Sequence, residues 1–200
     1  MSETFSIDPR AAALLLMDFQ VGVIDGFAGP DKDATLDRAA RLLTAARDSG
    51  LRVIHVVVGF RPGHPEVSRR NASFGPMRGS DRFTAGDPGA AIHPAVSPIE
   101  GEMVVTKHRV GPFQGTELDL VLRAHDVDTL VLAGIATSGC VLSAVRHAAD
   151  ADYRLVVVED CCSDRDAELH RVLLRTLFPR QAAVATMQDV ARAISAAAVG

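Results

Sequence analysis

Short apolar segments of strand length alternate with longer segments of helical period along most of this 200-residue chain. Three of the apolar segments, residues 14–16, 56–58 and 156–158, contain only leucine or valine. A strand with one face in water alternates apolar and polar residues, whereas a strand buried on both faces is apolar throughout. The chain is therefore constrained to a sheet that helices cover on both sides.

The alternation predicts six strands and the helices between them. The strands are expected at residues 12–17, 52–58, 102–107, 129–133, 154–158 and 182–185, and the helices at 35–48, 116–125, 140–151, 165–178 and 189–198. Strands that alternate with helices pair in parallel, because the helix carries the chain back across the sheet. We expect an α/β fold, a three-layer α/β/α sandwich with a six-stranded, mainly parallel sheet, in one domain over residues 1–200.

Residues 59–97 interrupt the alternation with prolines, glycines and five arginines. A loop of this length inside a compact domain is usually functional or mobile. Two interpretations stay open. The segment is either a solvated surface excursion, or a lid or oligomer arm that carries Phe60, Phe74 and Phe83 over a neighbouring pocket.

Charge and cysteine content exclude several classes of protein. The 25 acidic and 21 basic residues leave a net charge of -4, and no lysine or arginine block suggests nucleic acid or an anionic membrane as a partner. The first apolar stretch is broken by Asp18 and Gln20, so it resembles neither a secretory signal nor a membrane span. Three cysteines, two of them adjacent, indicate free thiols in a reducing compartment, and we expect a cytoplasmic protein.

Three reactive side chains lie at or after the ends of predicted strands: Asp18, Lys107 and Cys140. In a parallel sheet the ligand crevice lies beyond the carboxyl ends of the strands, so these groups should converge. Alone, each has an ordinary explanation as a turn former, a solvated charge or a buried thiol. Together they suit attack by a thiol. A helix N-terminus and a nearby ammonium are expected to lower the pKa of Cys140, and Asp18 could serve as base and then acid.

The residues around these groups resemble a known superfamily. The segment 134–141, Gly-Ile-Ala-Thr-Ser-Gly-Cys-Val, resembles the nucleophile motif of the isochorismatase-like cysteine hydrolases. Asp18-Phe19-Gln20 resembles their Asp-x-Gln motif, and Lys107 with the following Phe113, Gly115 and Thr116 resembles their lysine segment. The similarity spans residues 12–164, and its three motifs occur in the family's order and spacing.

The resemblance implies a role for each residue. Cys140 would be the nucleophile, Asp18 the proton shuttle and Lys107 the cation that keeps both charged. The backbone N–H groups of Ala136 and Cys140 would form an oxyanion hole after a cis peptide bond between Ile135 and Ala136. The implied reaction is hydrolysis of a C–N bond in a small amide, carbamoyl or ureido compound through a thioester, without a cofactor.

Two other functions remain open within the same fold. One is vinyl ether hydrolysis of the isochorismatase type, and the other is a non-catalytic binding or assembly module. The resemblance also implies a homodimer or homotetramer. The predicted substrate-binding residues are Phe19, Gln20, Arg61, Phe113 and Thr137. Arg61 or Arg109 could clamp a substrate carboxylate in a bidentate pair, although each is equally explained as a surface charge.

Neither a metal site nor a redox pair is predicted. His64 and His93 are the possible ligands, but the Asp-x-His arrangement of the metal-binding relatives is missing and no carboxylate lies at metal-site spacing. Cys161 and Cys162 are adjacent, which does not permit an unstrained disulfide, so we expect packing roles for both.

Overall fold

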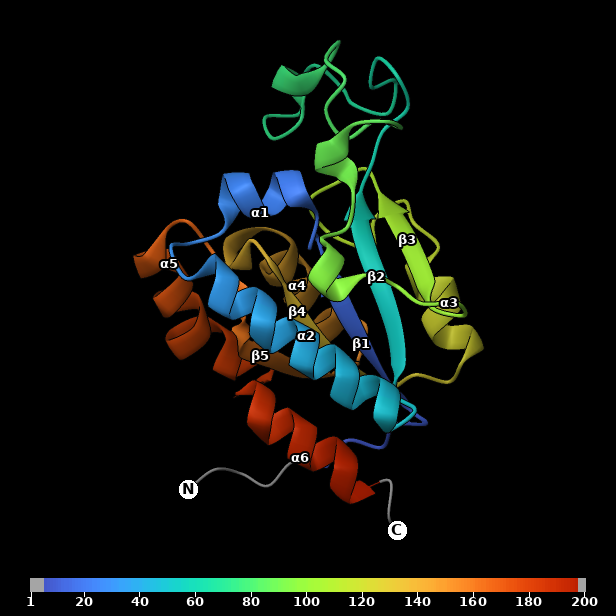
Figure 1. Cartoon of the computed structure of the whole chain (residues 1–200), viewed down its shortest axis with the longest axis vertical. Helices are drawn as coiled ribbons and strands as arrows, with labels where there is room; N and C mark the ends of the chain where they lie inside the picture. Colours follow the sequence, from blue (N-terminus) through green and yellow to red (C-terminus); the bar gives the residue numbers. More distant parts are fainter. Residues whose placement is uncertain (1–5, 198–200) are drawn as a thin grey trace.

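The computed structural model describes residues 6–197 and contains one sheet of six parallel strands in the order β3-β2-β1-β4-β5-β6. The predicted fold class is confirmed (Figure 1). The strands are β1 (Ala12–Met17), β2 (Arg52–Val58), β3 (Met103–Lys107), β4 (Thr129–Ile135), β5 (Arg154–Ser163) and β6 (Ala183–Ala185).

Helices cover both faces of this sheet. They are α1 (Val21–Phe27), α2 (Lys32–Asp48), α3 (Leu118–Ala124), α4 (Leu142–Asp150), α5 (Ala167–Val172) and α6 (Met187–Ala197). Helices α1, α2 and α6 contribute buried side chains to a core on one face, and α3 and α4 contribute to a second core on the other. None of the helices within residues 6–197 is long and apolar enough to cross a lipid bilayer.

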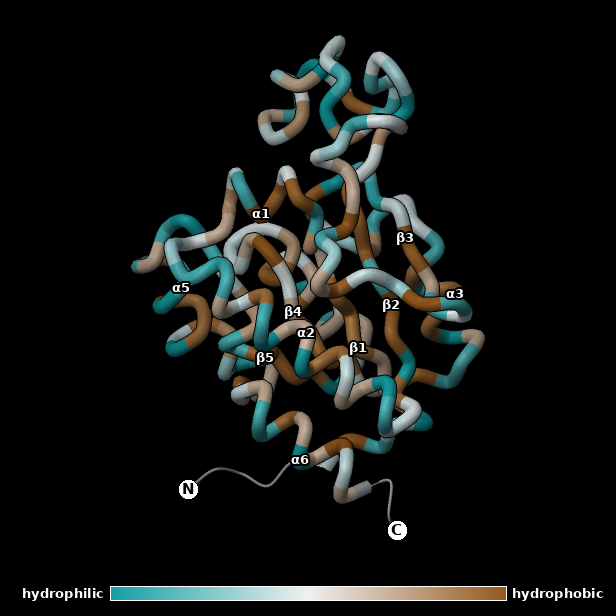
Figure 2. The backbone as a smooth tube through the Cα atoms, in the orientation of Figure 1, coloured by the Kyte–Doolittle hydropathy of each residue, from teal (hydrophilic) through white to brown (hydrophobic). Residues whose placement is uncertain are grey.

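The two cores explain why the strands are apolar throughout. Along β1, Leu14 and Leu16 belong to the core beneath α2 and α6, whereas Leu15 and Met17 belong to the core beneath α4. Successive side chains of a strand point to opposite faces, so a strand between two helix layers needs an apolar residue at every position. Figure 2 shows this hydrophobic interior along the central strands.

The strand order creates a switch point between β1 and β4. From β1 the chain builds outward through β2 and β3, then returns to place β4 on the other side of β1. In sheets of this kind, ligands bind beyond the carboxyl ends of the strands where the order reverses. The residues that follow β1 and β4 are therefore the first place to look for a site.

Several element boundaries differ from the predictions. Helix α1 was not predicted, and β5 continues to Ser163, five residues past its predicted end. The predicted helix at 140–151 begins only at Leu142, because Cys140 lies in a π-helical turn, Thr137–Val141. The predicted helix at 165–178 is divided into α5, a second π-helical turn, Leu173–Leu177, and a 3₁₀ turn, Phe178–Arg180.

The 59–97 segment lies beyond the carboxyl end of β2, at the top of Figure 1. Its aromatic side chains pack mostly on one another, with the ring of Phe60 4.9 Å from His64 and 5.3 Å from Phe74. Phe60 and Phe83 are buried, and a β-bridge joins Phe60 to Thr84. Phe60 and Phe83 belong to the same hydrophobic core that lies beneath α2 and α6, and Phe74 packs against it, so the segment extends that core.

A partly buried carboxylate connects the edge strand to the helix layer. Glu102, just before β3, accepts two hydrogen bonds from Arg47 of α2 at 2.7 and 2.9 Å. It also contacts His55 Nε2 of β2 at 3.1 Å and accepts the N–H of Ile99 at 3.0 Å. The Arg47 guanidinium is the main reason that the pKa of Glu102 falls from 4.5 to about 2.

We predict that Glu102→Gln lowers the free energy of unfolding at pH 7 by about 2 kcal/mol, because a hydrogen-bonded charge is lost. The folded-state pKa of Glu102 lies below its usual value, so this stabilisation is present above about pH 4.5 and is lost as the pH falls toward 2. Urea unfolding of both proteins at several pH values measures it. The exposed neighbour provides the control, since Glu100→Gln should change little, and a pH-independent difference for Glu102→Gln would contradict the assignment.

Candidate active site

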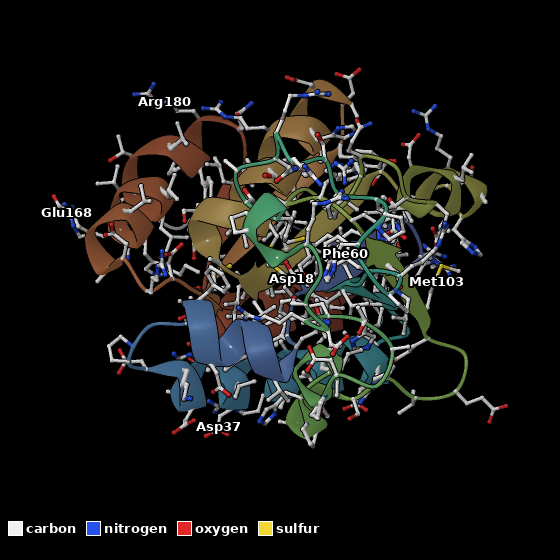
Figure 3. The ribbon with its side chains drawn as sticks, turned by 90° about the horizontal axis from the view of Figure 1, so that it is seen from above. Asp18, Asp37, Phe60, Met103, Glu168 and Arg180 are labelled. Carbon is white, nitrogen blue, oxygen red and sulfur yellow. The ribbon has the colours of Figure 1, made fainter. Side chains whose placement is uncertain are left out.

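Asp18 follows β1 directly and adopts a left-handed backbone conformation, with φ of 59°. Its N–H extends the strand pairing by donating to the Val56 carbonyl at 2.8 Å. Aspartate is among the few non-glycine residues that enter this region readily. The turn leaves the Asp18 side chain only 8% exposed, near the middle of the molecule in Figure 3.

Lys107 ends β3, two strands away from β1 in the sheet. Two strand spacings amount to about 10 Å, a gap that a lysine and an aspartate can close together. The ammonium of Lys107 donates to Asp18 Oδ2 at 2.9 Å and to the Arg109 carbonyl at 3.0 Å. The Lys107 side chain is 2% exposed, so a fully buried ion pair joins the ends of β3 and β1.

Cys140 lies in the Thr137–Val141 turn, which follows β4 after a cis peptide bond between Ile135 and Ala136. The thiol donates a hydrogen bond to the Ile135 carbonyl at 3.3 Å. Gly134 makes room for it, because a Cβ atom at this position would lie 2.9 Å from the Met17 carbonyl oxygen and 3.3 Å from Cys140 Sγ. Asp18, Lys107 and Cys140 thus form one buried cluster at the switch point, which we call the Asp18 cluster.

Burial controls the protonation of this cluster. Burial raises the pKa of Asp18, and the ammonium of Lys107 opposes that rise. Burial also raises the pKa of the Cys140 thiol well above its usual value, and the negative charge of Asp18 raises it further. The expectation of a lowered thiol pKa is wrong for this structure. Cys140 lies inside a π-helical turn instead of at a helix N-terminus, and desolvation outweighs the nearby ammonium.

One oxygen of the cluster has no partner. Among the described residues, nothing donates a hydrogen bond to Asp18 Oδ1, although the atom is buried. A buried polar atom without a partner is costly and calls for an explanation in a native structure. A carboxylate oxygen that is held open beside a thiol is suited to receive a proton.

Two backbone donors at the turn lack a partner in the described structure around it. Within residues 6–197, no group outside the turn accepts a hydrogen bond from the N–H of Ala136 or of Cys140. The neighbouring donors are used, since Ser138 N–H donates to Asp164 at 2.8 Å and Gly139 N–H donates to the Ala136 carbonyl at 3.0 Å. Backbone N–H groups beside a thiol can stabilise negative charge on a carbonyl oxygen.

Known proteins resemble this chain over most of its length. A family model described as the Isochorismatase domain matches residues 12–189. The chain belongs to the isochorismatase family. A maleamate amidohydrolase from Pseudomonas putida is 34% identical over 183 residues, which cover 90% of this chain and 85% of that protein.

Solved structures support the same assignment. An isochorismatase family protein from Burkholderia thailandensis superposes with a TM-score of 0.85 at 30% identity, covering 95% of this chain and 98% of the other. N-carbamoylsarcosine amidase from Thermoplasma acidophilum superposes with a TM-score of 0.73 at 29% identity, covering 88% and 96%. The isochorismatase fold therefore extends over nearly the whole described chain.

The predicted substrate-binding residues of this isochorismatase-family protein do not gather at one place. Phe19 and Phe113 are buried in the cores on opposite faces of the sheet. Arg61 is exposed and pairs with Glu66 at 3.3 Å. Thr137 is fully buried, with its hydroxyl 2.8 Å from His170 Nδ1.

Gln20 lies two residues after Asp18, but hydrogen bonds within the protein already occupy its side-chain amide. Its Nε2 donates to the carbonyls of Val58 and Ala90 at 2.9 and 2.8 Å, and its Oε1 accepts the N–H of Val58 at 2.8 Å. Both N–H groups of the amide are therefore occupied. Gln20 links the ends of β1 and β2 to the far end of the 59–97 segment.

The other two cysteines are buried, and the two histidines considered as metal ligands are hydrogen-bonded. Cys161 and Cys162 point into opposite cores, and burial raises the pKa of both, that of Cys162 to about 12. His64 contacts the Arg82 carbonyl through Nε2 at 2.9 Å, and His93 caps a 3₁₀ turn. Residues 6–197 contain no group of three or more histidine, cysteine or acidic side chains placed to hold a metal ion.

Sequence reasoning missed three residues that shape the site: Gly134, Asp164 and His170. Gly134 carried a usable signal, because an isolated glycine inside an apolar strand indicates a close approach to its backbone. Asp164 and His170 carried none, since their partners Ser138 and Thr137 lie 26 and 33 residues away in the chain.

We predict that Gly134→Ala destabilises the protein by about 1–3 kcal/mol, because the new methyl group overpacks the space between β1 and Cys140. Gly139→Ala, in the same turn, is the matched control. Its Cβ atom would meet nothing closer than 3.7 Å. Urea unfolding measures both variants, and equal losses of stability would contradict the role of Gly134.

We predict that Asp18→Asn moves the alkaline titration of Cys140 to lower pH, because the negative charge that raises the pKa of this thiol is removed. Only the thiolate is alkylated, so iodoacetamide should label Cys140 faster in the variant than in the wild type at the same pH. Mass spectrometry over a pH series measures this rate. Asp166→Asn, at an exposed position, should leave the curve unchanged, and an upward shift for Asp18→Asn would contradict the coupling.

Proposed function

We propose that this protein is a cysteine hydrolase that cleaves a C–N bond of a small amide, carbamoyl or ureido compound. The observation that carries the proposal is the Asp18 cluster, in which a buried ion pair leaves one carboxylate oxygen open beside a thiol. Two of its relatives support the reaction class, since they are named maleamate amidohydrolase and N-carbamoylsarcosine amidase.

In the first half of the proposed reaction, Cys140 forms a covalent bond with the substrate. Asp18 Oδ1 takes the proton of the thiol while Sγ attacks the substrate carbonyl carbon, which matches a thiol whose pKa burial keeps high. The N–H groups of Ala136 and Cys140 donate to the resulting oxyanion. Asp18 then gives its proton to the leaving nitrogen, the C–N bond breaks, and a thioester to Cys140 remains.

In the second half, water releases the product. Asp18 accepts a proton from water as the oxygen attacks the thioester carbonyl, and the same two N–H groups stabilise the second tetrahedral intermediate. The C–S bond breaks, the thiolate of Cys140 takes the proton from Asp18, and the free carboxylic or carbamic acid leaves. Each proton that Asp18 takes is returned, so the carboxylate is restored after each turnover.

Lys107 holds Asp18 in place through both halves. Its hydrogen bond to Oδ2 leaves Oδ1 as the oxygen that exchanges protons. The ammonium also lowers the cost of keeping a carboxylate in a buried site, since it opposes the rise in the pKa of Asp18. A neutral side chain at Lys107 would leave that carboxyl protonated and unable to act as a base.

Substrate entry requires a movement of the covering segments, because all three side chains of the cluster are buried. Two surface hollows, of about 290 and 480 Å³, are lined by residues of β5 and α5 and by residues of the 59–97 segment, and neither includes the cluster. The 59–97 segment binds the residues that follow Asp18, since Gln20 donates to the Ala90 carbonyl at 2.8 Å and the His93 N–H donates to the Phe19 carbonyl at 2.8 Å. Figure 3 views Asp18 and Phe60 from the end that carries this segment. We assign the 59–97 segment the role of a lid.

We predict that Cys140→Ala abolishes hydrolysis, lowering kcat by about a thousandfold or more, because the covalent path is lost. Ammonia release from a panel of small amides and ureido acids gives the activity. Cys161→Ala is the control, since that thiol lies on the other side of the sheet and should leave kcat within about twofold of wild type.

Two results would overturn the proposal. The wild-type protein could release no ammonia from any member of the panel, or Cys140→Ala could remain active. Ammonia release by Cys140→Ala would show that C–N hydrolysis does not need this thiol, whereas cleavage of a vinyl ether without ammonia release would favour vinyl ether hydrolysis. Acid quenching during turnover followed by mass spectrometry should detect Cys140 with the acyl group attached.

A further inference from the structure

Asp164, which follows β5, binds the turn that carries Cys140. Its Oδ2 accepts the N–H of Ser138 at 2.8 Å and the hydroxyl of Ser138 at 2.6 Å. Its Oδ1 accepts the N–H of Asp166 at 3.1 Å. Asp164 is 6% exposed, so these charge-assisted hydrogen bonds form away from water, where they are strong.

A second contact joins the same two segments. The hydroxyl of Thr137, also in the turn, lies 2.8 Å from Nδ1 of His170 in α5. Helix α5 packs beside the turn and is drawn in orange in Figure 1. Two consecutive turn residues, Thr137 and Ser138, are therefore each held by the chain that follows β5.

The segment that follows β5 is itself anchored to the loop that follows α1. The Ser163 hydroxyl accepts the N–H of Gly29 at 2.9 Å. A Cβ atom at Gly29 would lie 2.8 Å from the Asp164 carbonyl oxygen, so the loop after α1 packs closely against the backbone of Asp164. The loop after α1 thus holds the backbone of Asp164 in place, while the Asp164 carboxylate binds the Thr137–Val141 turn.

The hydrogen bonds of Asp164 determine which backbone N–H groups of the turn remain without a partner outside it. Asp164 occupies the N–H of Ser138, and nothing outside the turn occupies those of Ala136 and Cys140. A carboxylate near an oxyanion site opposes the negative charge that develops there, so its presence needs a compensating benefit. Alignment of two N–H donors with the attacking thiol is such a benefit. A displacement of a reacting group by about 1 Å can lower the rate about a hundredfold.

We propose that Asp164 is a positioning residue, which sets the Thr137–Val141 turn so that Cys140 and the open N–H groups face the substrate. The inference rests on the proposed function. Asp164 does not touch the substrate, and it acts through Ser138.

The test compares Asp164→Ala with Asp164→Asn and with Asp166→Ala. Asparagine keeps a carbonyl oxygen that can accept from Ser138. Asp166 caps α5 by accepting the N–H of Leu169 at 2.9 Å, and its side chain has no hydrogen bond to the turn. Asp166→Ala therefore controls for general damage to the same segment. The measurements are kcat, KM, the melting temperature, and the rate at which iodoacetamide labels each cysteine.

We expect Asp164→Ala to lower kcat about tenfold or more with little change in KM, and Asp164→Asn to recover most of the loss. Release of the turn should also expose Cys140, so its labelling should become at least about threefold faster while Cys161 and Cys162 are unaffected. Asp166→Ala should lower the melting temperature and leave kcat and Cys140 labelling unchanged.

A kcat for folded Asp164→Ala within twofold of wild type would overturn the inference, as would labelling that rises equally at all three cysteines. If Asp164→Ala does not fold, Ser138→Ala decides, because it removes one of the two hydrogen bonds without leaving a polar group of its own unpaired. An unchanged kcat for Ser138→Ala would then overturn the inference. The labelling measurement needs no substrate, so it tests the positioning role even if the proposed hydrolysis fails.

Discussion

The burial of the Lys107–Asp18 ion pair is the constraint on which the site depends. Removing two ions from water costs several kcal/mol each, and only close pairing and further hydrogen bonds offset that cost. Here the pairing uses Oδ2 of Asp18 and leaves Oδ1 without a partner. The same burial keeps the Cys140 thiol neutral. The ion pair, the unpartnered oxygen and the protonated thiol therefore have one common cause. The carboxyl ends of β1, β3 and β4 are closed off from water.

Much of the fold and the three residues of the cluster could be predicted from the sequence, because both leave local signals. An apolar run without polar residues predicts a doubly covered strand, and a reactive residue at a strand end predicts a position at the crevice. Helix α1 was missed because glycine is a poor helix former and α1 contains two. Gly22 serves another purpose there, since a Cβ atom would lie 3.0 Å from the Gly89 carbonyl oxygen.

The protonation and alignment of the groups in the site are harder to predict than which residues form it. The pKa of Cys140 depends on desolvation by residues from several strands, and no local pattern around a cysteine records how completely it will be buried. The roles of Ser138 and Thr137 depend on partners in the segment after β5, which meet them only in the folded chain. Motifs identify the candidate reacting groups, whereas tertiary packing determines their protonation and alignment.

The left-handed conformation of Asp18 limits which acid can occupy its position. Among the two acidic residues, aspartate enters this region of backbone space far more readily, because its short side chain can hydrogen-bond locally. Glutamate would bring the same functional group but would have to bend the end of β1 into a conformation it disfavours. The backbone conformation alone therefore favours aspartate over glutamate here, so replacement by the longer acid would fail on conformation before reach or acidity mattered.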